Sequence, residues 1–130
     1  MHHAILVVSG LVAVGVGAAL LFDPVGFEAS AGVELPTNAS ILSEMRASGG
    51  ALLAGGVLVT AGAFVRRLTF SATLVATVLY LAYGSARALG ILADGMPADG
   101  LVVAMVVEIA IGAACLGMLT RNFGVASART

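Results

Sequence analysis

Four apolar windows dominate this chain, and each is nineteen residues long: 4–22, 47–65, 68–86 and 101–119, of which the last contains Glu108. At about 1.5 Å per helical residue, such a window reaches about 28 Å, close to the ~30 Å thickness of a membrane's hydrocarbon core. A segment in hydrocarbon must satisfy its backbone polar groups internally, which favours helices. The windows therefore predict an all-α membrane protein with four transmembrane helices in an antiparallel bundle.

The small charged fraction also indicates a lipid environment. Only 10% of the 130 residues are charged and 60% are hydrophobic, whereas a soluble domain carries roughly 25% charged residues. Glycine and alanine are abundant and lysine is absent, a composition typical of bacteria, so the bacterial inner (plasma) membrane is the expected location. No basic stretch precedes the first window. We therefore interpret this window as a retained helix rather than a signal peptide.

The expected helices form a single domain over 1–130 and extend beyond some of the windows. Asp23-Pro24 ends the first helix, and the segment that follows is an interfacial loop with room for one short helical turn. Asp99 is expected to cap the fourth helix, and the candidate N-caps of the second are Thr37, Asn38 and Ser40. The predicted ranges are about 4–22, 40–65, 68–92 and 100–120 for the helices and 23–38 for the loop.

Small residues recur where helices are expected to touch. Ser9, Ala13 and Gly17 follow one another every four positions, and glycine pairs stand at 49–50 and 55–56. Such positions let helix backbones approach closely in a membrane. We interpret them as packing surfaces.

The charges outside the helices are separated by sign. With four spans, both termini lie on the side of the turn between the second and third helices, and the other two connections lie on the opposite side. The first side holds Arg66, Arg67, Arg121 and Arg129, and the second holds Asp23, Glu28, Glu34, Asp94 and Asp99. Because arginine and lysine mark cytoplasmic loops, both termini are predicted to be cytoplasmic.

Four further charges fall inside the expected helices, in the outer half of the membrane. From the outer helix ends, Glu44 and Arg46 are about 5–8 Å deep, Arg87 ~8 Å and Glu108 ~10 Å. A lone charge at the membrane centre costs at least ~2.5–3.5 kcal/mol, so Glu108 must be paired, protonated or hydrated. Arg46 and Arg87 are the arginines at its depth, and Glu44 has the further interpretation of an acid favoured by its helix dipole.

The chain's two tyrosines share a face of the third helix with one of these charges. Tyr83 and Tyr80 precede Arg87 by four and seven residues, so all three side chains project from one face. They could donate several hydrogen bonds to one carboxylate or to an anionic head group. Two hypotheses stay open for Arg87 and Glu108, a structural clamp between helices and a ligand or proton site, and the tyrosines have a second interpretation as interface anchors.

Ligands for metals and cofactors are scarce. Cys115 is the single cysteine, which excludes an intrachain disulfide and a zinc site. Both histidines stand at positions 2 and 3, outside the windows, which excludes bis-histidine haem ligation within the bundle. We expect no cofactor, no metal and no catalytic residue, and an enzyme is not the expected class, although intramembrane acids can support acid–base chemistry.

Several short motifs, in this order and spacing, resemble a known family. They are Asp23-Pro24, Ser43-Glu-Met-Arg-Ala47, Gly49-Gly50, Arg87, Asp94-Gly-Met-Pro97 and Glu108. The chain resembles, over essentially its whole length, a bacterial four-helix integral membrane family of unknown function (domain of unknown function 4345). Members often have an aromatic residue where this chain has Ser48. The resemblance implies a four-helix inner-membrane protein and brings no activity with it.

Three functions remain open. The first is a small accessory or structural membrane subunit held by a charged cluster of Arg46, Arg87 and Glu108. The second is a lipid or amphiphile binder that uses this cluster, with Glu44, Tyr80 and Tyr83, as its head-group site. The third is proton-coupled transport of a small solute. The expected partners are membrane lipids, with another membrane protein or a second copy of the chain left open, and no nucleic acid.

Overall fold

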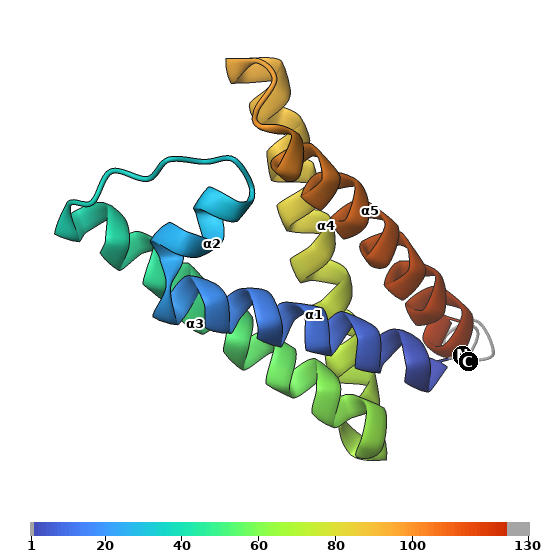
Figure 1. Cartoon of the computed structure of the whole chain (residues 1–130). Coiled ribbons are helices and arrows are strands. Elements are labelled where there is room, and N and C mark those ends of the chain that lie inside the picture. Colours follow the sequence, from blue (N-terminus) through green and yellow to red (C-terminus); the bar gives the residue numbers. More distant parts are fainter. Residues whose placement is uncertain (1, 125–130) are drawn as a thin grey trace.

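The computed structural model describes residues 2–124, and the part it describes contains helices and no β-strand. Four of the helices are long and apolar enough to cross a membrane (Figure 1). A 3-10 turn, Arg66–Leu68, precedes α4, and a π-helical turn, Thr120–Gly124, follows α5. The α-helices are α1 (His2–Phe22), α2 (Pro24–Ser30), α3 (Ala39–Phe64), α4 (Thr69–Asp94) and α5 (Asp99–Leu119).

The long helices begin and end within two residues of the predicted ranges. The caps at the starts of α3 and α5 differ in how they agree with the prediction. The Asn38 side chain accepts a 2.9 Å hydrogen bond from the Ile41 nitrogen and starts α3, as the candidate N-caps predicted. The prediction for Asp99 is wrong. Ala98 occupies the N-cap of α5 without a side-chain hydrogen bond, and Asp99 lies one residue later, in the first turn, where its charge is favoured by the helix dipole.

The connection between α1 and α3 contains a helix of seven residues, α2. Asp23 accepts a 3.1 Å hydrogen bond from the Gly26 nitrogen, and Pro24 occupies the first helical position, where its missing N–H costs nothing. The helix ends where the Val33 nitrogen donates to the Glu28 oxygen over 2.9 Å. Gly32 has a φ of 86° there, which glycine adopts without strain and which closes the helix end.

The helices α1 and α3 form the first helix pair, and glycines set their separation. A Cβ atom on Gly49 would lie 2.6 Å from the Leu21 nitrogen and 2.7 Å from the Gly17 oxygen, so the two backbones are in direct contact. One period of seven residues later, a Cβ on Gly56 would lie 2.6 Å from the Val14 nitrogen. A Cβ on Gly50, by contrast, would meet nothing within 4 Å. Of the two neighbouring glycines, Gly49 therefore packs against α1 and Gly50 does not.

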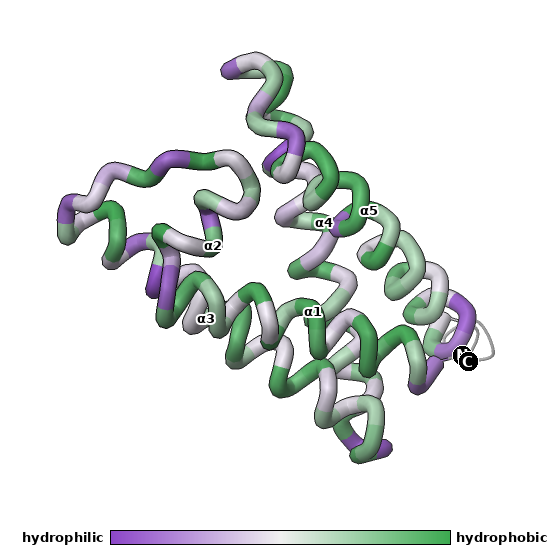
Figure 2. The backbone as a smooth tube through the Cα atoms, viewed as in Figure 1, coloured by the Kyte–Doolittle hydropathy of each residue, from purple (hydrophilic) through white to green (hydrophobic). Residues whose placement is uncertain are grey.

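The helices α4 and α5 form the second helix pair. A Cβ on Gly112 would lie 3.0 Å from the Leu81 nitrogen, and one on Gly84 would lie 3.3 Å from the Ile109 nitrogen. The two pairs converge where α3 passes into α4 and separate toward α2 (Figure 1). Hydrophilic residues gather at the helix ends and in the α2–α3 connection, while α1 and α5 are mostly hydrophobic along their length (Figure 2).

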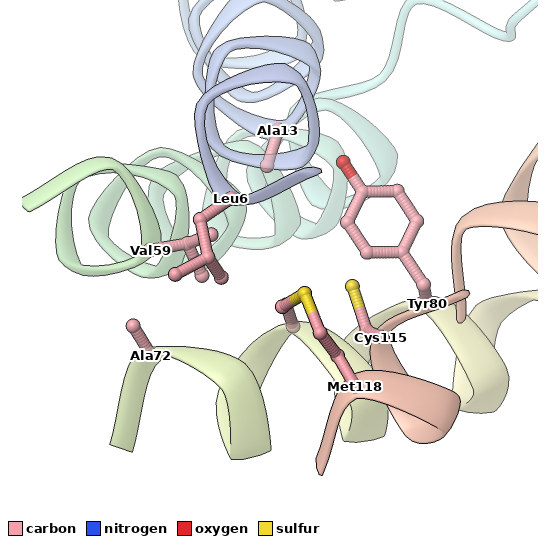
Figure 3. Packing of buried hydrophobic residues seen from close by; sticks show 8 residues of the cluster. Leu6, Ala13, Val59, Ala72, Tyr80, Cys115 and Met118 are labelled. Atoms are coloured by element: carbon pink, nitrogen blue, oxygen red, sulfur yellow. The ribbon is translucent and has the colours of Figure 1, made fainter. Parts of the chain in front are cut away.

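The buried core lies where the two helix pairs meet. Leu6 of α1 and Val59 of α3 face Cys115 and Met118 of α5, and Tyr80 reaches from α4 toward α1 (Figure 3). At the same end, the Asn122 amide nitrogen and the His2 ring nitrogen are 2.7 Å apart. The core therefore joins the pairs at one end and leaves them apart at the other, where the candidate site lies.

Candidate functional site

A cavity of about 310 Å³ lies between the two helix pairs, beside α2. Residues of α1, α2, α4 and α5 line it, and Leu52 of α3 completes the wall. Thirteen of its eighteen lining residues are apolar or glycine. The polar and charged lining residues are Glu28, Tyr80, Tyr83, Arg87 and Glu108. The cavity is thus a hydrocarbon-lined space with a small polar section.

An ion pair forms part of this polar section. The Nε of Arg87 on α4 donates to the Oε2 of Glu108 on α5 over 2.9 Å. The side chains are 32% and 16% exposed, respectively. The close contacts at Gly84 and Gly112, both on the core side of the pair, hold the two helices near enough for the short glutamate to reach the guanidinium. It is the one ion pair found within residues 2–124.

Both tyrosine hydroxyls cross from α4 to the first helix pair. The Tyr80 hydroxyl donates to the main-chain oxygen of Ser9 on α1, and the Tyr83 hydroxyl lies 2.9 Å from the Ser48 hydroxyl on α3. Both tyrosines line the cavity together with Arg87. The hydroxyls, however, bind the two serines rather than the Glu108 carboxylate.

Arg46 and Glu44 do not line this cavity. Arg46 is exposed and donates through Nη1 to the Leu21 oxygen, in the last turn of α1, where a cation stabilises the free carbonyls. Glu44 is exposed too and has no hydrogen-bond or ion-pair partner in the described part of the chain. Of the four charges that the sequence places at one depth, the structure brings together Arg87 and Glu108.

Glu28 belongs to this site although the sequence does not single it out. The sequence predicts an interfacial loop at this position, whereas in the structure Glu28 lies on α2, half-buried, and lines the cavity together with Phe27 and Ala31. The signal was present in the sequence. Asp23-Pro24 is a helix start, and a glycine at 32 is a helix end, so a helix that presents positions 27, 28 and 31 on one face could have been predicted.

The opposite end of the molecule carries the arginines that lie outside the long helices. Arg66 and Arg67 form the turn before α4, and Arg121 follows α5. His3 accompanies them there, with its ring 4.9 Å from that of Phe64. Arg129, which the charge argument also used, lies outside the described residues. Within residues 2–124 no three histidine, cysteine or acidic side chains come close enough to hold a metal ion.

The comparisons with known proteins agree with the resemblance drawn from the motifs. No curated protein and no solved structure matches the chain. One family model covers residues 1–119, which includes all five α-helices and both members of the ion pair. The chain belongs to the family described as Domain of unknown function (DUF4345).

Proposed function

We propose that this multi-pass membrane protein binds an amphiphile in the cavity between its helix pairs. The hydrocarbon part of the ligand lies against α1 and α5, and its head group lies at Arg87 and Glu108. The observation that carries the proposal is the composition of the cavity wall, apolar except for one section with an ion pair. Ligand sites are typically apolar pockets of about 300–1,000 Å³ with a few placed polar groups, and this cavity has that character.

The charge distribution supports a topology for the proposed site. The spans cross in alternating directions in a bacterial inner membrane, with both termini and the arginines 66, 67 and 121 on the cytoplasmic side. Arg87 is seven residues from the end of α4, about 10 Å, and Glu108 is nine residues from the start of α5, about 14 Å. The ion pair would then lie in the outer half of the membrane, and the ligand would come from that leaflet.

The accessory-subunit hypothesis draws on the same ion pair. The position of the ion pair, however, favours ligand binding. Arg87 and Glu108 join α4 to α5, two helices that already pack closely at Gly84 and Gly112. A clamp for the whole bundle would join the two helix pairs, and Tyr80 and Tyr83 make those connections instead. Proton-coupled transport has less support, since the Glu108 carboxylate is already bound to the Arg87 guanidinium.

A cavity-filling substitution tests the proposal. Ala104 of α5 lines the cavity, whereas Val106, two residues further on, is 59% exposed and does not. We expect protein extracted from native membranes to retain a stoichiometric amphiphile, measured by native mass spectrometry. Ala104→Phe should lose it, and the matched control Val106→Phe should keep it. Equal amphiphile content in all three proteins would refute the proposal.

A further inference from the structure

We propose that the ligand's head group bears an ammonium group, an inference that rests on the proposed function and specifies its ligand class. The charged groups on the cavity wall are Glu28, Arg87 and Glu108, two carboxylates and one guanidinium. Arg87 and Glu108 neutralise each other. Within residues 2–124, no basic nitrogen lies within the 4.0 Å of Glu28 that an ion pair requires. The wall therefore carries one negative charge in excess.

The fold holds Glu28 at the cavity. Its own main-chain oxygen accepts the hydrogen bond from Val33 that closes α2, and Pro24 at the start of the same helix is fully buried. Ala31, the C-cap residue of α2, also rests on the start of α5, since a Cβ on Gly100 would lie 2.7 Å from the Ala31 oxygen. Glu28 is thus fixed between α1 and α5 and is not a side chain of a free loop.

A half-buried carboxylate without a cation in the protein is suited to bind a cationic group of a ligand. Charges withdrawn from water in proteins are paired, and an ammonium has three N–H donors to offer a carboxylate. Arg87 uses its Nε for Glu108, and its other guanidinium nitrogens are donors for an anionic group next to that ammonium. Two kinds of molecule share the required chemistry: a phosphatidylethanolamine, which has both charges, and a long-chain alkylamine, which has the ammonium alone.

The decisive experiment compares head groups, with the same acyl chains in the two phospholipids and a chain of equal length in the alkylamine. The full chain, purified in a mild detergent and stripped of lipid, is titrated with phosphatidylethanolamine, phosphatidylglycerol or an alkylamine, and binding is read by native mass spectrometry. The proteins compared are the wild type, Glu28→Gln, the matched control Glu34→Gln and the cavity-filled Ala104→Phe. Glu34 is exposed in the α2–α3 connection and does not line the cavity.

We expect the wild type and Glu34→Gln to bind at least one of the ammonium ligands about tenfold more tightly than phosphatidylglycerol, which corresponds to about 1.4 kcal/mol. The tighter of the two ammonium ligands identifies the source. Glu28→Gln should lose the preference, and Ala104→Phe should lose binding of every ligand. Equal binding of phosphatidylglycerol by the wild type, or a preference that survives Glu28→Gln, would overturn the ammonium inference alone. Binding that Ala104→Phe leaves unchanged would instead overturn the proposed site.

Discussion

The Nε of Arg87 donates to the Oε2 of Glu108 over 2.9 Å, and this contact joins α4 to α5 at the wall of the cavity. The two residues are 21 positions apart in the chain. Neither Arg46 nor Glu44 takes part, since Arg46 binds the end of α1. The polar section of the cavity is therefore built by the second helix pair and by α2.

Removing one member of this ion pair should cost more than removing both. Glu108→Leu leaves an arginine without its partner, and Arg87→Leu leaves a glutamate without its partner, so each single variant should lose about 1–3 kcal/mol of unfolding free energy. The double variant has no unpaired charge and should lose less than either single variant. Unfolding in mixed detergent micelles measures these differences, and strictly additive losses would contradict the coupling.

Tyr83 and Ser48 connect the two helix pairs, and a double-mutant cycle measures that connection. Tyr83→Phe and Ser48→Ala each remove one hydroxyl of the 2.9 Å contact, and each should lower the unfolding free energy by about 0.5–1.5 kcal/mol. The double variant should lose little more than either single variant, because the same hydrogen bond is lost in all three. If the losses add, the hydroxyls do not interact.

Gly49 and Gly50 are neighbours in the chain and should respond in opposite ways to alanine. A Cβ on Gly49 would collide with the α1 backbone at 2.6 Å, whereas one on Gly50 meets nothing within 4 Å. Gly49→Ala should therefore destabilise the protein by about 1–3 kcal/mol. Gly50→Ala should be neutral or stabilising by up to about 1 kcal/mol, the helix preference of alanine. Thermal unfolding compares the two, and a similar loss in both would contradict the packing.

Cysteine labelling in whole cells tests the orientation. In a Cys115→Ala background, Glu34→Cys places a thiol in the α2–α3 connection and Gly124→Cys places one after α5, both at exposed positions. A membrane-impermeant maleimide should label Glu34→Cys in intact cells and Gly124→Cys only after permeabilisation, because the arginine-rich end is predicted to face the cytoplasm. The reverse pattern would invert the topology and move the cavity to the inner leaflet.

Much of the helical architecture was predictable because its causes are local. A helix in an apolar segment makes its backbone hydrogen bonds within that segment, so the length of each window and the cap at Asn38 predict α3 without knowledge of its neighbours. The same holds for the face that Tyr80, Tyr83 and Arg87 share, which follows from helical spacing. For α2 the sequence predicts only an interfacial loop with room for one short helical turn, because its seven residues fall short of the usual length of a helix.

The sequence by itself determined the four long helical segments, the separation of charge between the two ends of the protein, and the side chains that share a helix face. Only the tertiary structure decided which faces meet. Gly49 rather than Gly50 touches α1, and the tyrosines bind serines of the first helix pair. Ala31, at the end of α2, rests against Gly100, and Glu28 lines the cavity. These contacts join residues far apart in the chain. Close packing of the helices selects them, and no local pattern in the sequence encodes that selection.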